Sequence, residues 1–226
     1  MSAEEWAVIR LTVKVAALST VITLPIAIWL GWLFARQKMP FKTVVEALIS
    51  LPLVAPPVVT GYLLLLILGK NGVVGSVLES LFGIRLAFSF GALLTASVVV
   101  SLPLSVRAIR SAFELVDPTY EKASMTLGAS PFSTFFRISL PMAMPGVLSG
   151  SVLAFARSLG EFGATITLAG NIAGKTQTIA LMVYAHMQVP GEEMQVARLV
   201  TFSIVLSVGA IIASEWMNRK RVYDKK

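Results

Sequence analysis

Residues 117–141 read DPTYEKASMTLGASPFSTFFRISLP, a polar stretch with many turn-forming residues between two long apolar runs. Asp117, followed by a proline, is a typical helix start, because the carboxylate can cap the helix and proline fits its first turn. Gly128 favours a left-handed helix end, and Ser130, also followed by a proline, repeats the start signal. The pattern predicts two short helices joined by a glycine turn, with Pro141 preventing simple continuation into the next segment.

The chain is too apolar for an ordinary soluble domain, with 56% hydrophobic residues, 14% charged residues and a mean hydropathy of +0.80. Its 226 residues give room for five or six membrane spans of about 20 residues each. We therefore predict an all-α, polytopic membrane helical bundle, with residues 1–226 forming a single transmembrane domain. The acidic N-terminus and the long apolar run behind it do not resemble a cleaved signal peptide, so we expect this segment to be retained.

Five apolar segments are predicted to span the membrane, and they cover residues 7–34, 44–68, 86–106, 142–169 and 196–217. Prolines inside the second segment should bend or break its helix. Residues 176–189 are apolar but too short to cross comfortably, so we interpret them as a half-helix or a re-entrant piece. If that piece does cross, the bundle has six spans and an inner N-terminus.

Basic residues gather on one side of these predicted spans, and Lys and Arg in short loops favour the cytoplasmic side. Twelve of the 19 basic residues follow the first or third span or end the chain: Arg36, Lys38, Lys42, Arg107, Arg110, Lys122, Arg137, Arg219, Lys220, Arg221, Lys225 and Lys226. This bias predicts an outer N-terminus, a cytoplasmic C-terminus and a cytoplasmic position for residues 117–141. Arg10 and Lys14, near the outer end of the first span, count mildly against it.

Two short helices with a tight turn on the cytoplasmic side would form a solid protrusion. Phe132, Phe135 and Phe136 give the second helix an apolar stripe. Such a protrusion suits the groove of a partner protein. The alternative is that both helices lie on the lipid headgroups as interfacial helices.

The spacing within this stretch resembles the EAA signature of ABC importer permeases. The matching positions are Ala123, Ser124, Gly128, Ile138, Leu140 and Pro141. The chain departs from the signature at its glutamate, where Lys122 stands and Glu121 comes one place early. The stretches LPLVAPPVVTGYLLL, LPLSVRAIR and AFARSLGEFGATITLAGN are similar to the molybdate permeases of that family, and the sulfate and thiosulfate permeases share the LGEFG-like region.

The resemblance implies a permease subunit in the cytoplasmic (inner) membrane of a prokaryote. It implies a homodimer, two cytoplasmic ABC ATPase subunits and a periplasmic or extracellular oxyanion-binding protein. The implied cargo is molybdate or tungstate, with sulfate or thiosulfate as the alternative. Residues 117–141 would be the cytoplasmic coupling loop, and the implied ATPase-coupling residues are Tyr120, Glu121, Ala123, Leu127, Gly128, Phe132, Phe135, Ile138, Leu140 and Pro141.

The sequence contains no G-x-x-x-x-G-K-[ST] phosphate loop. We therefore expect no ATPase activity and no cofactor in this chain, with ATP and Mg²⁺ bound by the partner ATPase. The stretch GKNGVVGS at residues 69–76 is rich in glycine but lacks the Gly-Lys-Ser/Thr ending, and we interpret it as an outer turn.

Arg157 and Glu161 are four residues apart near the middle of the fourth predicted span. An unpaired charge there is costly, so we expect the two side chains to pair with each other or to face a water-filled cavity. A structural ion pair and a place in the anion path are both open. Ser158, Thr165 and Thr167 are the hydroxyl candidates for that path, whereas Gly146 and Gly150 are expected to serve close helix packing.

Other functions have little support in the sequence. His186 is the only histidine and the chain has no cysteine, so a metal site or a nucleophilic catalytic site is not expected. The basic residues stand at the ends of apolar runs, which does not indicate nucleic-acid binding. A secondary anion transporter remains a less favoured alternative, since it would show deep carboxylates in several spans and an inverted repeat.

Overall fold

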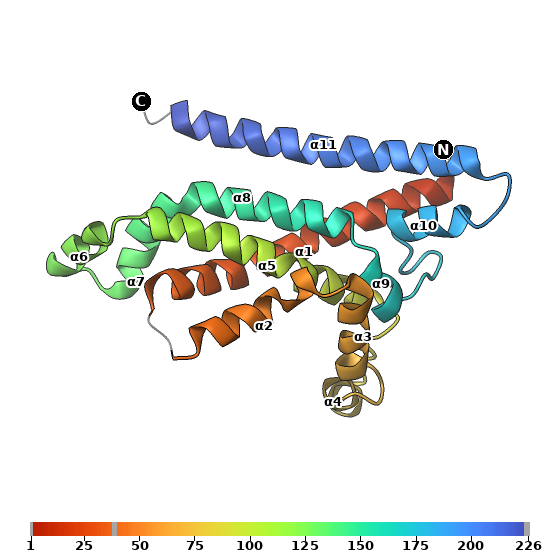
Figure 1. The fold of residues 1–226 in the computed structure, drawn as a ribbon, viewed down its shortest axis with the longest axis horizontal. Helices are drawn as coiled ribbons and strands as arrows, with labels where there is room; N and C mark the ends of the chain where they lie inside the picture. The colour runs from red at the N-terminus through yellow and green to blue at the C-terminus, as the bar shows by residue number, and fades with distance from the viewer. Residues whose placement is uncertain (1, 38–39, 224–226) are drawn as a thin grey trace.

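The computed structural model describes residues 2–37 and 40–223, with side chains described as far as Ile212, and these residues fold into helices and connecting turns (Figure 1). The elements are α1 (Ala3–Arg36), α2 (Lys42–Val54), α3 (Pro57–Leu68), α4 (Val73–Phe82), α5 (Phe90–Leu115), α6 (Pro118–Thr126), α7 (Pro131–Thr134), the π-helical turn η1 (Phe135–Ser139), α8 (Leu140–Leu159), α9 (Gly163–Leu168), α10 (Ile179–His186) and α11 (Glu193–Tyr223).

The long apolar helices confirm the predicted membrane bundle. Four described stretches are long and apolar enough to cross a membrane, namely α1, α5, Pro131–Leu159 and the α11 segment Glu193–Ile212. The pair α2 and α3, bent by 116°, makes a fifth span if it is counted as one. The predicted break in this span lies at Ala55 and Pro56, whereas Pro52 stays inside α2. Helix α10 has eight residues, about 12 Å, which fits a half-helix.

Helices α1, α5 and α8 lie side by side and form the centre of the bundle (Figure 1). A Cβ atom at Gly146 would lie 2.1 Å from the Cβ of Ala112, so α5 and α8 approach as closely as glycine permits. The Ser105 hydroxyl donates to the carbonyl oxygen of Gly150 at 2.8 Å. The predicted packing role of Gly146 and Gly150 is therefore confirmed.

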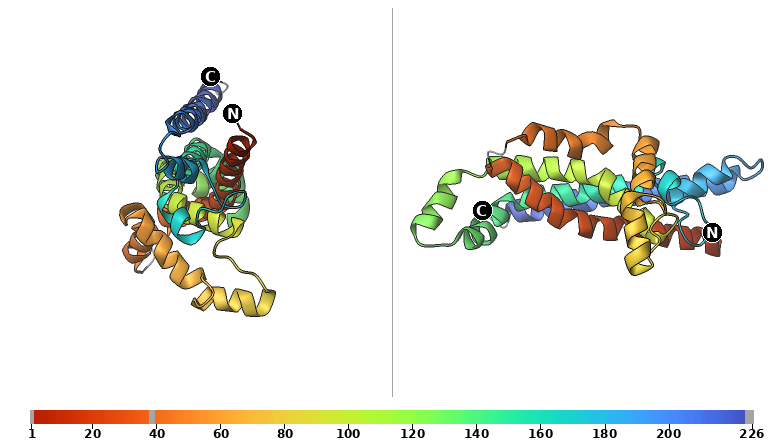
Figure 2. Two further views of the ribbon diagram at one scale, coloured as in Figure 1. Left: turned by 90° about the vertical axis from the view of Figure 1, so that its right-hand side faces the viewer. Right: turned by 90° about the horizontal axis from the view of Figure 1, so that it is seen from below.

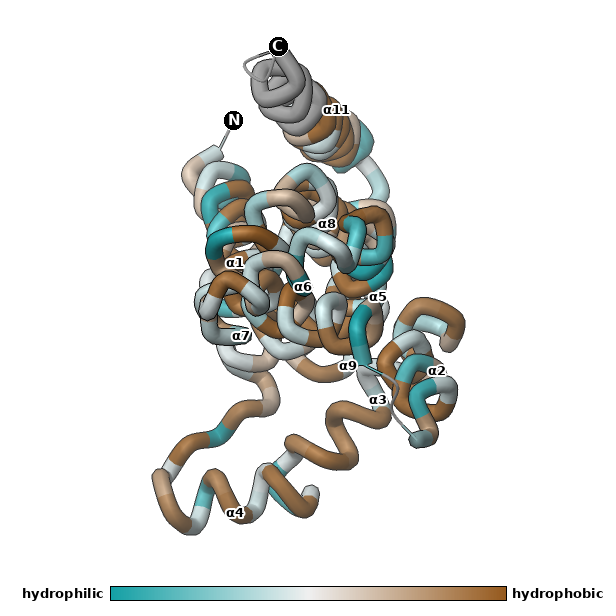
Figure 3. The backbone as a smooth tube through the Cα atoms, turned by 90° about the vertical axis from the view of Figure 1, so that its left-hand side faces the viewer, coloured by the Kyte–Doolittle hydropathy of each residue, from teal (hydrophilic) through white to brown (hydrophobic). Residues whose placement is uncertain are grey.

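The two ends of the bundle differ. The loop helices α6 and α7, the start of α2 and the C-terminal end of α11 lie at one end, and the N-terminus, α9 and α10 lie at the other (Figure 1). Helices α3 and α4 project away from the bundle axis (Figure 2). Viewed from the α6–α7 end, α4 is mostly hydrophobic and lies away from the central bundle, in contact with α3 (Figure 3).

Three sequence predictions of element boundaries were wrong. The fourth span does not run through residues 142–169, because α8 ends at Leu159 and the separate helix α9 begins at Gly163. The third span does not end at residue 106 but continues to Leu115. The glycine-rich stretch is a turn only as far as Gly72, because Val73 begins α4.

The prediction that Pro141 separates the second loop helix from the next span was also wrong. Helix α7 continues through η1 into α8. In the π-helical turn the N–H of Leu140 donates to the carbonyl oxygen of Phe135, five residues earlier. The wider turn changes the hydrogen-bonding register immediately before Pro141, which has no N–H to donate.

Candidate functional site

The loop helices α6 and α7 begin at the two predicted starts. The Oδ1 atom of Asp117 accepts the Thr119 N–H at 2.8 Å, and this hydrogen bond lowers the pKa of the Asp117 carboxyl. The hydroxyl of Ser130 accepts the Ser133 N–H at 3.2 Å. Between them Gly128 has a φ of +88°, the left-handed conformation that the predicted glycine turn requires.

One carboxylate fastens this loop to the bundle. Glu121 Oε1 accepts a hydrogen bond from Arg36 Nε at 3.1 Å and another from the Ser139 hydroxyl at 2.7 Å. Arg36 also donates through Nη2 to the carbonyl oxygen of Val116 at 2.6 Å. The side chains of Arg36 and Glu121 are only 13% and 14% exposed. Glu121 therefore joins α6 to the end of α1 and to η1.

The outward surface of the loop is apolar. Leu127 is 89% exposed and Phe132 is 74% exposed, and Tyr120 and Ala123 are exposed beside them. We name these four residues the knuckle. Their proposed contact with an ATPase remains a prediction.

Other predicted coupling residues lie on the inner side of the loop. The ring of Phe135 lies 5.5 Å from Trp32 and 6.1 Å from Phe113, measured between ring centroids, so it packs into the bundle. Ile138 and Leu140 are half-buried, and Pro141 is exposed at the start of α8. The Phe135 ring therefore packs the loop against the bundle, whereas Pro141 stays exposed.

A second candidate site lies at the break between α8 and α9. Arg157 Nη1 lies 2.7 Å from Glu161 Oε2, although the two groups are not aligned as a hydrogen bond. Glu161 Oε1 accepts the Ala164 N–H at 2.7 Å. The predicted ion pair is present, but Glu161 lies beyond the end of α8 and not on the same helix as Arg157. Its carboxylate, only 2% exposed, connects the end of α8 to the first turn of α9.

The hydroxyl groups predicted near this pair all have partners inside the chain. Ser158 accepts a hydrogen bond from Ser19 at 2.9 Å. Thr165 donates to the carbonyl oxygen of Phe162, and Thr167 donates to that of Gly163, each at 2.9 Å. A role of these residues in an anion path stays a prediction.

Two glycines bring α9 against α3: Gly163, whose small surface the sequence predicts to serve helix packing, and Gly61, which the sequence did not single out. A Cβ atom at Gly61 would lie 2.7 Å from the Cα of Ala164, and one at Gly163 would lie 2.6 Å from the Cβ of Pro57. Contacts this short leave no room for a side chain. Helix α9 is therefore packed directly against the bent span.

Within the described residues, no group of three or more His, Cys, Asp or Glu side chains could hold a metal ion. His186 has an acidic neighbour that sequence spacing did not reveal, because its Nδ1 contacts the Glu192 carboxylate. The two residues lie on either side of the turn between α10 and α11.

The chain matches a known family along most of its length. Residues 24–222 match the family described as "Binding-protein-dependent transport system inner membrane component". The chain is 50% identical over 216 residues to the "Molybdenum transport system permease protein ModB" of Haemophilus influenzae, covering 96% of this chain and 94% of that protein. It is 47% identical to the Escherichia coli K12 protein of the same name, over 95% of this chain and 94% of that one.

The fold also matches a solved structure. The crystal structure of a bacterial ABC transporter involved in the import of the acidic polysaccharide alginate superposes with a TM-score of 0.75. The match covers 97% of this chain and 80% of that chain at 18% sequence identity. At this identity the likeness concerns the fold alone.

Proposed function

This chain belongs to the family of binding-protein-dependent transport system inner membrane components, and from that membership we propose that it is the permease subunit of an ATP-driven importer of molybdate. The observation that carries the cargo assignment is the identity of about half of all residues with molybdenum permeases along nearly the full length of both chains. Tungstate, another tetrahedral oxyanion, is included in the proposal. Sulfate or thiosulfate is the alternative cargo.

The importer requires partners. The sequence has no phosphate loop, so two cytoplasmic ABC ATPase subunits would bind the ATP and Mg²⁺. An oxyanion-binding protein would deliver the cargo on the outer side. The proposed complex contains two copies of this chain. Helices α3 and α4 expose Leu66, Val73, Leu81 and Phe82 in the single chain, an apolar surface that lipid or the second copy would cover.

The proposed orientation puts the N-terminus outside and the C-terminus in the cytoplasm. The loop helices and the C-terminal end of α11 share one end of the bundle (Figure 1). Arg36, Lys42, Arg107, Arg110, Lys122 and Arg137 belong to elements at this end, as the positive-inside rule requires of a cytoplasmic side. Of the other predicted cytoplasmic charges, Lys38, Lys225 and Lys226 lie outside the described residues, as do the side chains of Arg219, Lys220 and Arg221.

The coupling mechanism follows from the connections of the loop. An ATPase that binds the knuckle would move α6 and α7 together when it closes on ATP. The Glu121 carboxylate would pass this movement to α1 through Arg36. The uninterrupted path from α7 through η1 would pass it to α8, and Glu161 would pass it on to α9.

A purified complex tests the proposal. The tagged permease should copurify with an ATPase subunit, and ATP hydrolysis should rise when the binding protein is loaded with molybdate and not when it is loaded with sulfate. Stimulation by sulfate instead would move the assignment to the sulfate permeases. If no ATPase copurifies and the reconstituted chain moves the anion without ATP, the importer proposal is wrong and a secondary transporter takes its place.

A further inference from the structure

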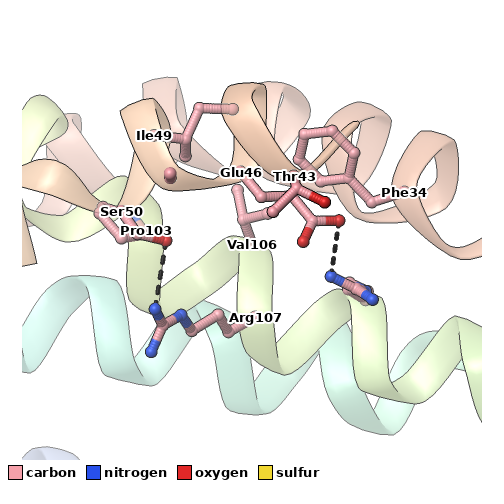
Figure 4. A pocket seen from close by; sticks show the side chains of 10 residues that line it. Phe34, Thr43, Glu46, Ile49, Ser50, Pro103, Val106 and Arg107 are labelled. Carbon is pink, nitrogen blue, oxygen red and sulfur yellow. Dashed lines mark hydrogen bonds and ion pairs between the residues drawn. The ribbon is translucent and has the colours of Figure 1, made fainter. Parts of the chain in front are cut away.

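A cleft that the proposed mechanism does not use lies between α2 and α5 (Figure 4). Its volume is about 390 Å³. Polar groups gather on its walls, with Thr43, Glu46 and Ser50 from α2 and Arg107 and Arg110 from α5.

The two arginines of this cleft have different surroundings. Arg110 is neutralised, because its Nη1 lies 2.7 Å from Glu46 Oε1 and its Nε donates to Glu114 Oε1 at 2.7 Å. Arg107 takes part in none of the ion pairs among the described residues. Its Nη2 donates to the Ser50 hydroxyl at 3.2 Å, which is a neutral partner (Figure 4).

The position of Arg107 makes this difference significant. Arg107 lies eight residues before the end of α5, about 12 Å from the end of this candidate membrane span. Charged side chains in such helices face a partner or a wet cavity and commonly mark the path of an ion. Arg107 is exposed in the single chain and has only the neutral Ser50 as a partner, so an anion that enters the cleft from outside can reach it.

The remaining charges permit an anion there. Glu46 would repel one, but its Oε1 atom lies within 2.7 Å of Arg110 and 3.8 Å of Lys42, although neither contact is aligned as a hydrogen bond. Counting Lys42, Arg107 and Arg110 against Glu46 and Glu114, the cleft and its borders carry one net positive charge. A guanidinium matches two oxygens of a tetrahedral anion, and a serine hydroxyl can donate to a third.

We propose that Arg107 and Ser50 form a weak binding subsite for a tetrahedral oxyanion on the cytoplasmic side of the permease. The proposal rests on the proposed function, since the cargo on its way out of the membrane is one such anion. The phosphate of an anionic lipid headgroup has the same chemistry and is the other source. A weak site suits this position, because an anion that is held tightly here would not be released.

The experiment uses a cysteine as a reporter, because the chain has none of its own. Ala47 is exposed and lines the cleft, so Ala47→Cys changes little. The complete complex carrying this variant is placed in nanodiscs of phosphatidylcholine, and the rate of labelling of the permease by uncharged N-ethylmaleimide is measured. Sodium molybdate or sodium sulfate is added, with sodium chloride at equal ionic strength as the control.

Molybdate or sulfate should slow the labelling, and chloride should not. Adding Arg107→Gln should raise the half-protecting concentration about tenfold, the effect of losing one strong charge-assisted contact. Arg107→Lys should retain part of the protection. Arg137→Gln removes an exposed arginine of η1 that does not line the cleft, and it should leave the protection unchanged.

A second set of nanodiscs distinguishes the sources of the anion. If phosphatidylglycerol slows labelling in an Arg107-dependent way, and molybdate and sulfate have no effect in phosphatidylcholine, then the site binds a lipid phosphate. If neither the lipid nor the added anions slow labelling, the subsite does not exist. That result would leave the importer proposal intact as long as molybdate-loaded binding protein still stimulates ATP hydrolysis.

Discussion

The turn between α6 and α7 requires glycine at position 128 because of its backbone conformation, and not because a side chain would lack space there. The φ of Gly128 is +88°, and a Cβ atom placed there would meet no other atom within 4 Å. We expect Gly128→Val to destabilise the turn by about 1–2 kcal/mol, because a β-branched residue strongly disfavours the left-handed region. Less ATPase should copurify with this variant, while membrane insertion should stay normal.

Asparagine provides the matched control at this position, since it adopts the left-handed conformation more easily than other non-glycine residues. Gly128→Asn should keep most of the ATPase binding and transport. Normal transport by the valine variant would contradict the idea that this turn positions the knuckle.

Glu161 connects two helices through its two oxygen atoms. Glu161→Ala leaves Arg157 without its partner and the Ala164 N–H without its acceptor, so we expect a loss of about 3–5 kcal/mol, typical of breaking a buried pair. Glu161→Gln keeps an acceptor for the Ala164 N–H and should lose less. Thermal unfolding of the purified complex measures both.

The double variant Arg157→Ala with Glu161→Ala separates pairing from transport. If the pair is structural, the double variant should lose less unfolding free energy than the sum of the losses of the two single variants. A place in the anion path would instead be supported by two results. The losses of the single variants would add up in the double variant, and Arg157→Ala alone would impair transport without changing the melting temperature.

The loop helices depend on a contact at their base that is distant in sequence. Glu121→Ala removes the acceptor of both Arg36 and Ser139, and hydrogen bonds to charged groups contribute about 1.5–3 kcal/mol each. We expect α6 to loosen and hydrogen exchange of its amides to rise. ATP hydrolysis should then respond poorly to the loaded binding protein even where the ATPase still binds.

Lys122→Ala is the control for this variant, because Lys122 is the exposed neighbour of Glu121 on the same helix. It should leave both hydrogen exchange and coupling close to normal. Equal effects of the two substitutions would show that the Glu121 contact has no special part in coupling.

Local signals predicted the starts and turns of the loop helices, because the capping atoms of Asp117 and Ser130 lie within three residues of the N–H groups that they accept. The length of α5 was not predictable in this way. Arg107 and Arg110 resemble the end of a span, but their partners Ser50 and Glu46 lie on another helix. The break at residues 160–162 was also missed, and it places α9 in close contact with α3, a segment distant in sequence.

The orientation of the bundle can be tested with single cysteines. Met125 lies on α6 and Ala173 lies in the loop between α9 and α10, and both are exposed. A membrane-impermeant thiol reagent applied to intact cells should label Ala173→Cys and should reach Met125→Cys only after the membrane is opened. Labelling of Met125→Cys from outside would contradict the proposed topology and the coupling mechanism together.

The stretch Pro131–Leu159 contains no gap between its start beside the loop helices and its far end. At about 1.5 Å per residue its helical path is about 43 Å long, and if it moved as a rigid rod, a tilt of about 10° around its middle would displace each tip by up to about 4 Å in opposite directions. In the proposed mechanism, a small displacement at the loop-helix end would become an opposite displacement at the other end, where this rod meets α9 and the glycine contact with the bent span. Had Pro141 severed this rod, the same displacement would have been absorbed at the joint.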